Sequence, residues 1–503
     1  MTDRSLISRR RLLGGAAAGS AALLAGGAKA SPATPAWDEE RDVVVIGSGF
    51  AGLAAAIEAR KTGADVLVLE KMPVFGGNSM IDGGLMTATG AAPQKAAGVE
   101  DTPALLEQDM LEAGGHANDP AKVRLVASSA AENYAWCRDE LGVKFKDGVL
   151  VRLKGHSVPR SVQTINASGS AIVIPEIQRA LALGVDMRRH ARVEELLRSP
   201  DGRVEGLLVL EGDPARERRI RARKGVVACY GGFGADPMYV GWRVPALGDA
   251  APTNNQPGAT SELWRATAAI GALQLHDDCV ECRPYGNPLE KGAGIGDAYN
   301  RLAASRGFWV NRDGRRFVDE SAPSDELVRA VMRENKEGRG AWALMNARFA
   351  RDFRRAAPEA FDAMFASGLV TRWDTLDELG RGLGIDVEEL KAETARFNRS
   401  VADGVDHEFG RPLASVLVPE RVGPWYAGPI EPKVQFCAGG LATDLEGRVI
   451  DVRTDAPIPG LFAAGEATGG VHGTGALASV PILECLVFGR IAGRSAASGG
   501  RSA

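Results

Sequence analysis

The chain of 503 residues is 45% hydrophobic and carries a formal net charge of −4, with 60 basic and 64 acidic side chains. A chain of this length can bury a large core and form two or more domains. The charges are balanced, and no basic stripe or mixture of basic and aromatic residues stands out, so we expect no nucleic-acid partner.

The first 30 residues predict a twin-arginine signal peptide. Arg9, Arg10 and Arg11 precede a small, apolar stretch over residues 14–28, and Ala28-Lys29-Ala30 fits a small-x-small cleavage site. The apolar stretch is too short and glycine-rich to span a membrane, and no later stretch is long and apolar enough. We therefore expect an exported, periplasmic protein without a transmembrane segment. The alternative is a basic tail without a targeting role.

Removing these residues changes the net charge. Residues 1–30 carry five basic residues and one acidic residue, so the net charge of −4 becomes −8 in the mature chain. Residues 31–40 then read as a linker rich in Pro and Ala.

Residues 41–70 predict a βαβ unit that binds a dinucleotide. An apolar strand enters a G-x-G-x-x-G turn, and a second strand ends at Glu70, 21 positions after Gly49. Gly47 permits the tight turn, Gly49 lets the backbone approach a pyrophosphate, and Gly52 lets helix and strand pack closely. Glu70 can accept hydrogen bonds from ribose hydroxyls, and the helix N-terminus offers free N–H groups to phosphates.

Two later apolar runs predict further buried strands of a parallel sheet. Residues 225–229 lead into Tyr230-Gly231-Gly232, and residues 460–464 lead into Gly465-Glu466. A last helix should begin near Pro481, a residue favoured in a first turn. Residues 279–435 mix helical patterns, such as 325–335 and 387–401, with turn-rich segments. This is the profile of a domain inserted in a nucleotide-binding fold.

The six cysteines do not predict a metal site. Cys279 and Cys282 form one C-x-x-C without a second pair, and no C-x-x-C-H haem motif occurs. Export makes a disulfide there conceivable. Folding in a reducing cytoplasm before export favours free thiols instead.

From residue 41 to about 495 the sequence resembles the flavoprotein family of soluble fumarate reductases of the flavocytochrome c type. That family includes urocanate reductase and 3-ketosteroid dehydrogenases. The resemblance is carried by the βαβ unit with Glu70-Lys71 and by residues 76–79, 254–258, 310–317, 406–411, 464–473 and 483–490.

The resemblance implies an α/β fold, with a Rossmann-like FAD-binding domain (41–278 and 436–495), an inserted α+β capping domain (279–435) and a flexible tail (496–503). It also implies FAD. The residues we assign to cofactor binding are Gly47, Gly49, Ala51, Gly52, Glu70, Lys71, Gly76, Gly77, Asn78, Ser79, Gly83, Gly84, Val193, Gly231, Gly465, Glu466, Pro481 and Ile482. Residues 72–86 lack the histidine that attaches FAD in succinate dehydrogenases, so we expect non-covalent FAD.

The substrate residues depart from the family pattern. The arginine that clamps a substrate carboxylate three residues after the Val-His-Gly run is replaced by Ala476. The proton-donating arginine falls on Ala303 without gaps, with Arg301 two residues away. A histidine before a proline becomes Arg283, and another near the domain boundary becomes Gln435. We take Arg283, Arg301 and Tyr285 as the candidate catalytic residues. A planar guanidinium suits both carboxylate binding and proton transfer.

Three more residues have expected positions. His156 and Arg160 lie in a loop that, in members of the family, faces the active site. We expect His472 to pack near the flavin rather than to act as a base, because it lies between glycines in a tight turn.

The sequence therefore predicts an exported, FAD-dependent oxidoreductase that adds or removes hydrogen across a carbon–carbon bond of a small organic acid or carbonyl compound. Alanine at positions 476 and 303, in place of the clamp and donor arginines, would enlarge the substrate cavity and remove positive charge. Both effects argue against fumarate as the substrate. The electron donor or acceptor must be external, a cytochrome or a quinone-linked protein. Two alternatives remain: a 3-ketosteroid-type dehydrogenase, or a flavin-binding electron-transfer protein without substrate chemistry.

Overall fold

The computed structural model describes residues 36–248, 251–292, 294–356, 358–413 and 423–500. The predicted signal peptide and the first half of the linker lie outside these residues. From Trp37 onward the contacts define one compact unit. The first strand begins at Glu39, two residues inside the predicted linker, and the last helix reaches Ala497, two residues into the predicted tail.

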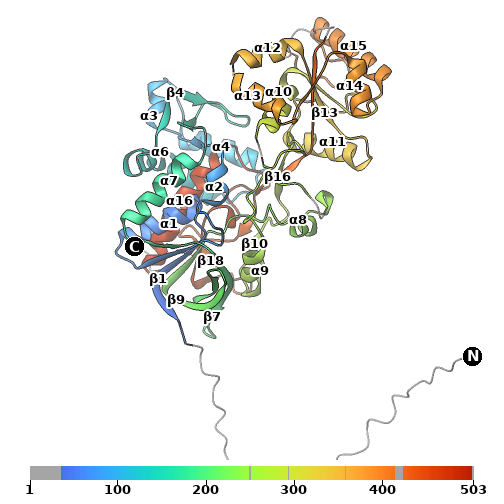
Figure 1. Ribbon diagram of the computed structural model, residues 1–503. Coiled ribbons are helices and arrows are strands. Elements are labelled where there is room, and N and C mark those ends of the chain that lie inside the picture. Colours follow the sequence, from blue (N-terminus) through green and yellow to red (C-terminus); the bar gives the residue numbers. More distant parts are fainter. Residues whose placement is uncertain (1–35, 249–250, 293, 357, 414–422, 501–503) are drawn as a thin grey trace, which may run out of the picture. The chain divides into compact units, whose positions relative to one another are not determined.

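An eight-stranded sheet with a parallel centre forms the middle of the FAD-binding part, and the parallel strands were predicted (Figure 1). Five parallel strands lie in the order β19-β9-β1-β2-β6, and β18 pairs antiparallel with β19 at one edge. β8 (Val204–Glu211) pairs antiparallel with β9 and with β7 (Ala191–Arg198). The strands are β1 (Glu39–Ile46), β2 (Val66–Leu69), β6 (Asp186–Arg188), β9 (Arg216–Ala228), β18 (Arg448–Ile450) and β19 (Pro457–Ala463).

Both faces of this sheet are covered, which explains its continuous apolar strands. Val43 and Val45 of β1 enter one core, and Val44 and Ile46 enter the other. The first core lies under α1 (Phe50–Lys61), α7 (Ser170–Ala182) and α16 (Val480–Ala497), with α1 packed against the other two. The second lies under β7, β8 and α9 (Glu262–Ala269).

Shorter elements complete this part of the chain. The helices are α2 (Gly77–Ile81), α3 (Ala92–Ala96), α4 (Pro103–Ala113), α5 (Pro120–Ser128), α6 (Ala130–Ala135) and α8 (Pro237–Arg243). A three-stranded antiparallel sheet holds β3 (Leu85–Thr87), β4 (Phe145–Val151) and β5 (Ser161–Thr164), and β10 (Gln274–Leu275) pairs with β17 (Gly440–Leu441).

The insertion has a sheet and hydrophobic cores of its own. Its antiparallel strands have the order β12-β13-β15-β14: β12 (Phe308–Val310), β13 (Trp342–Asn346), β14 (Thr371–Trp373) and β15 (Trp425–Pro429). Its helices are α10 (Ile295–Arg306), α11 (Ser324–Lys336), α12 (Ala347–Ala356), α13 (Pro358–Ala366), α14 (Leu376–Leu383) and α15 (Val387–Asp403). These elements enclose two apolar clusters distinct from those of the parallel sheet.

The insertion begins and ends at one antiparallel ribbon. β11 (Val280–Arg283) pairs with β16 (Lys433–Cys437), close to the predicted boundaries at 279 and 435. Glu281 pairs with Phe436 and Cys282 with Val434, so Gln435 is an extra residue on β16. This ribbon positions the predicted substrate residues.

Candidate functional site

A pocket opens where four strands of the parallel sheet end. Its walls include residues that directly follow β1, β2, β9 and β19: Gly47, Glu70, Cys229 and Ala464. Ligands of open α/β sheets bind at these carboxyl ends. The pocket therefore lies where the motif predicts a dinucleotide.

The turn between β1 and α1 has the geometry that its glycines predict. Gly47 has φ +96°, and a Cβ there would lie 2.3 Å from the carbonyl oxygen of Cys229. A Cβ at Gly52 would lie 2.1 Å from the carbonyl oxygen of Gly47. Gly49 and Ala51 line the pocket at the start of α1, where the first N–H groups of a helix have no partner within it. This end of the pocket is suited to a phosphate.

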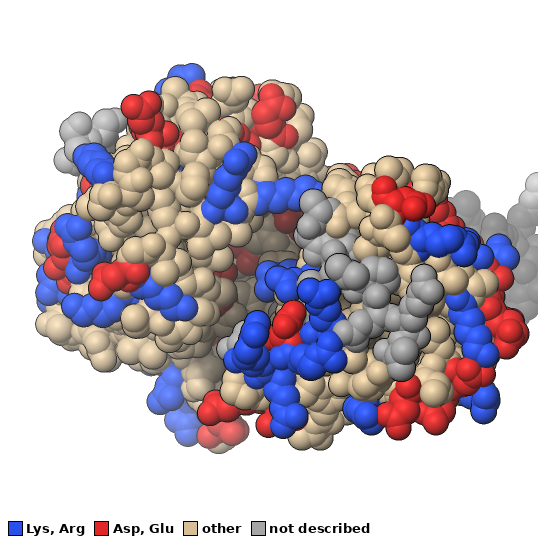
Figure 2. Space-filling view, turned by 90° about the horizontal axis from the view of Figure 1, so that it is seen from above, with Lys and Arg blue, Asp and Glu red and all other residues tan. Residues whose placement is uncertain are grey.

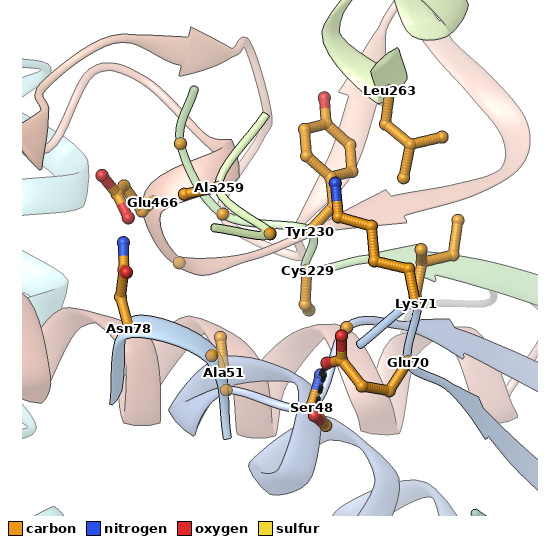
Figure 3. Close-up of a pocket in the computed structure, with 18 of the residues that line it drawn as sticks. Ser48, Ala51, Glu70, Lys71, Asn78, Cys229, Tyr230, Ala259, Leu263 and Glu466 are labelled. Carbon is orange, nitrogen blue, oxygen red and sulfur yellow. Dashed lines mark hydrogen bonds between the residues drawn. The ribbon is translucent and has the colours of Figure 1, made fainter. Parts of the chain in front are cut away.

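Glu70 lies at the same end, with its carboxylate held in a fixed position (Figure 3). The hydroxyl of Ser48 donates to Oε2 at 2.6 Å, and the backbone N–H of Met72 donates to Oε1 at 2.9 Å. Each carboxylate oxygen can accept more than one hydrogen bond. The buried carboxylate thus keeps capacity for ribose hydroxyls.

Glu466 and Asn78 form the opposite end of the pocket, where their side chains point toward one another (Figure 3). The backbone N–H of Cys437 donates to Oε1 of Glu466 at 3.0 Å. Burial raises the pKa of Glu466, while the N–H of Cys437 and the Asn78 side chain oppose that rise. Such a carboxyl group can bond to the hydroxyls of a ribityl chain.

The structure brings most of the predicted cofactor residues together. The pocket is lined by Gly47, Gly49, Ala51, Glu70, Lys71, Gly77, Asn78, Ser79, Val193, Gly231, Gly465 and Glu466. The remaining six are not among its lining residues: Gly52, Gly76, Gly83, Gly84, Pro481 and Ile482. Gly52 has its packing role, Pro481 lies in the first turn of α16, and Ile482 is buried in the core. Their contacts with a cofactor stay predictions.

Several lining residues were not among the predicted ones. They are Ile46, Ser48, Phe50, Leu69, Ala191, Arg192, Cys229, Tyr230, Gly232, Gln256, Gly258, Ala259, Thr260, Glu262, Leu263, Ala464 and Cys485. Ser48 lies inside the glycine motif, and Gln256 lies in a segment that carries the family resemblance, so both had a signal. Ala191 and Leu263 had none, because their positions depend on the packing of β7 and α9.

The three predicted catalytic residues lie close together on the insertion. Arg283 ends β11, Tyr285 follows it, and Arg301 is on α10. Burial raises the pKa of Tyr285, and the charges of Arg283 and Arg301 oppose that rise, so both guanidinium groups lie near the phenol. Asp297 accepts a hydrogen bond from Nε of Arg283 at 2.7 Å. Among the residues that the structure describes, no other carboxylate forms an ion pair with Arg283, so its terminal nitrogens can bind another anion. Figure 2 shows a hollow with Lys and Arg along part of its rim.

Ala303 is not part of this cluster, contrary to the sequence expectation. It is fully buried in the core of the insertion with Tyr299 and Trp309, so it does not enlarge a substrate cavity. Two positions along a helix are about 200° apart, which explains why Arg301 is exposed on the other face of α10. Arg301 is therefore the side chain of the pair that can reach a substrate, and its role as the proton donor stays a prediction.

Other candidate residues have structural partners. Arg160 is fully buried and pairs with Asp101 at 3.0 Å and with Asp109 at 2.6 Å. His156 contacts the carbonyl oxygen of Ala478 through Nε2 at 2.7 Å. His472 is buried edge-on against Phe436, and burial lowers its pKa to about 4. His472 is therefore packed, as we expected, and its position near the flavin stays a prediction.

Among the residues that the structure describes, no three His, Cys, Asp or Glu side chains form a group that could hold a metal ion. None of the helices that the structure describes has the length and apolar character to cross a membrane. All six cysteines are free, with Cys279 and Cys282 half-buried.

The comparisons with known proteins agree with this geometry. The sequence model of the FAD binding domain family matches residues 42–482. The acrylate reductase flavoprotein subunit of Shewanella woodyi is 33% identical over 487 residues, which cover 93% of this chain and 95% of that protein.

Solved structures agree with the sequence matches. The open form of a flavocytochrome c3 fumarate reductase has a TM-score of 0.83 at 30% identity, and the match covers 93% of this chain and 79% of that one. A 3-ketosteroid-Δ4-(5α)-dehydrogenase from Rhodococcus jostii RHA1 has a TM-score of 0.71 at 27% identity, over 92% of this chain and 98% of that one.

The pocket and the fold define a flavoprotein oxidoreductase. The chain belongs to the FAD-binding family that contains the soluble fumarate reductases. FAD is its cofactor, and it acts on C=C or CH–CH groups of a small molecule with an electron partner. The predicted fold class, cofactor and reaction type are thereby confirmed.

Proposed function

We propose that this protein reduces the C=C bond of a small α,β-unsaturated acid or carbonyl compound other than fumarate. The observation that carries this proposal is the cluster of Arg283, Tyr285 and Arg301 beside an FAD pocket, with Ala476 where a second cation would be needed. The similarity to the acrylate reductase subunit supports a substrate with one carboxylate.

Substrate binding, proton transfer and hydrogen bonding fall to different residues of this chain. When bound and reduced by the electron partner, FAD would supply a hydride to one carbon of the double bond. Arg283 binds the carboxylate or carbonyl oxygen, and Asp297 fixes the orientation of its guanidinium. Arg301 delivers a proton to the neighbouring carbon. This role suits Arg301 because its side chain is exposed and its charge acts on Tyr285, which binds the same substrate. Tyr285 donates a hydrogen bond to the substrate oxygen.

Fumarate fits this arrangement poorly. It brings two carboxylates into a closed site, and a buried carboxylate without a cation is strongly disfavoured. Arg283 can pair with one of them. The position at which the family pattern has the other arginine is Ala476, whose backbone N–H already bonds to Glu281.

A steroid-type dehydrogenase is the second candidate. The Rhodococcus jostii neighbour shares the fold over 92% of this chain, and Tyr285 could polarise a ketone in place of Arg283. An electron-transfer protein without substrate chemistry is disfavoured, because the relatives named above are all enzymes.

One experiment separates these candidates. The FAD-loaded protein is photoreduced without oxygen and then mixed with acrylate, crotonate, urocanate, fumarate or 4-androstene-3,17-dione. We expect rapid reoxidation by a monocarboxylate and slow reoxidation by fumarate. Reoxidation by none of the unsaturated acids would contradict the proposal, and steroid-dependent redox change alone would favour the second candidate.

We also propose that FAD is held without a covalent bond. Support comes from the segment behind the glycine turn, residues 72–86, which contains no histidine. Acid precipitation should release the yellow cofactor into the supernatant, and a yellow pellet would contradict the proposal.

We infer further that the protein is exported and exchanges electrons with a cytochrome or quinone-linked protein. The paired arginines at Arg9, Arg10 and Arg11 support export by the twin-arginine route. Replacing all three with lysine keeps the charge and removes the motif. The precursor should then stay in the cytoplasm; undiminished export of mature protein would show that the signal is of another kind.

A further inference from the structure

Glu281 lies between the FAD pocket and the arginine cluster. It is on β11, two residues before Arg283, and alternate residues of a strand share a face. Cys282, between them, lines a different cavity on the other side of the ribbon, together with Glu431. At the other end of the ribbon, Val280 pairs with Cys437, whose N–H bonds to Glu466 in the FAD pocket. Glu281 therefore lies on the ribbon between the FAD pocket and Arg283.

The carboxyl group of Glu281 occupies the place that a second anion would need. Oε1 accepts a hydrogen bond from the backbone N–H of Ala476. In the part of the chain that the structure describes, no Lys, Arg or His lies within ion-pair distance of Glu281. The backbone N–H of Ala476 is thus already bonded to an acid of the protein itself.

Glu281 also has an unusual acidity. Burial raises its pKa to about 7, the charge of Glu466 adds to that rise, and the N–H of Ala476 opposes it. Cys279, Cys282 and Cys437 are titratable neighbours on the same ribbon, and burial raises the pKa values of their thiols. Helix α11 packs against β11 and places Arg329, Arg333 and Lys336 around the cavity that Cys282 lines, on the other side of the ribbon from Glu281. On the adjoining loop His472 stays neutral, since burial lowers its pKa to about 4.

We propose that Glu281 is a specificity-determining residue that rejects a second carboxylate, so that the substrate places one carboxylate at Arg283 and a neutral group at Glu281. This inference rests on the proposed function of the same site. Above neutral pH the ionised Glu281 repels an anion; below it, the neutral acid presents an O–H that suits a carbonyl, amide or hydroxyl group.

The sign of the pH effect follows from the acidity of Glu281. As pH rises from 6 to 8, Glu281 loses its proton and gains a negative charge. Binding of a dicarboxylate should therefore weaken over this range, whereas binding of a monocarboxylate at Arg283 should change little. Removing the titrating group should abolish the difference.

The test uses the full-length, FAD-loaded protein and reads ligand binding from the flavin absorbance spectrum, without turnover. Fumarate and crotonate are titrated at pH 6 and pH 8 into the wild type, Glu281→Gln and the control Glu431→Gln, which removes a half-buried acid on the other side of the ribbon. We expect Glu281→Gln to tighten fumarate binding by about tenfold at pH 8 and to leave crotonate within about twofold. The control should match the wild type.

A second variant keeps the inference testable if Glu281→Gln does not load FAD. Ala476→Arg supplies a cation beside Glu281, and it should raise fumarate affinity while leaving crotonate affinity nearly unchanged. An unchanged fumarate-to-crotonate ratio in Glu281→Gln, or a spectrum that responds to neither acid, would overturn the inference. A shifted ratio in a protein that no unsaturated acid reoxidises would uphold the role of Glu281 and reject the proposed reaction.

Discussion

The FAD pocket and the substrate cluster are built in different ways. The pocket consists of turns at the ends of parallel strands, where backbone groups and glycines make the surface. The cluster consists of single side chains from β11, the turn after it and α10. A backbone surface requires particular residue types at fixed spacing, whereas a guanidinium can come from any nearby element. A sequence motif can therefore predict the cofactor, whereas the choice of substrate depends on a few exchangeable side chains that no motif fixes.

The largest effect should come from a glycine of the pocket. In Gly47→Ala the new Cβ would meet the carbonyl oxygen of Cys229 at 2.3 Å, which only a backbone shift can relieve. We expect loss of FAD and of most folded protein. FAD content by absorbance and the melting temperature would measure both.

Gly63→Ala is the matched control for that variant. Gly63 has φ +89°, close to the +96° of Gly47, but a Cβ there would have nothing within 4 Å. The strain alone should cost about 1–2 kcal/mol and leave FAD bound. Equal damage from the two variants would show that backbone strain, not contact with Cys229, governs the turn.

The next largest effect should come from the substrate cluster. Arg301→Gln removes the proposed proton donor, and loss of a positioned acid typically lowers turnover by about 10²–10⁴-fold. FAD content should not change, because Arg301 does not line the FAD pocket. Viologen-dependent reduction of a monocarboxylate would be compared with Arg306→Gln, an exposed arginine near the end of the same helix. Similar activities in the two variants would remove Arg301 from the mechanism.

These two regions also differ in how far the sequence predicts them. The βαβ unit, α11, α15 and the start of α16 lie where periodicity and glycine spacing place them. The charged first half of β9 was missed, since residues 216–221 pair with β8 at the edge and do not form an apolar run. In the cluster, residue identity alone could not decide between Ala303 and Arg301. That choice depends on which face of α10 packs on the core of the insertion.

The position of Glu281 could not be predicted from the sequence either. An acid near a C-x-x-C in a turn-rich segment carries no signal of its own. Its position follows from the pairing of β11 with β16 and from a contact with Ala476, which lies 195 residues further along the chain. Pairings over such distances are set by tertiary packing, and no local pattern encodes them.

The smallest effect should come from a side chain in the FAD pocket, and it tests whether the backbone dominates there. Glu70→Ala removes an acceptor for the ribose, and a hydrogen bond to a charged group contributes about 1.5–3 kcal/mol, roughly a tenfold to 150-fold change in Kd. Ser48 and Met72 would also lose their acceptor, so part of this loss would reflect the loop. Ser48→Ala breaks one of those loop contacts and keeps the carboxylate, which makes it the matched variant. FAD titration of the apoproteins, followed by fluorescence, should give a larger Kd for Glu70→Ala than for Ser48→Ala. The same Kd in both would mean that Glu70 supports the turn rather than the ribose, so that this end of the pocket recognises FAD through its backbone alone.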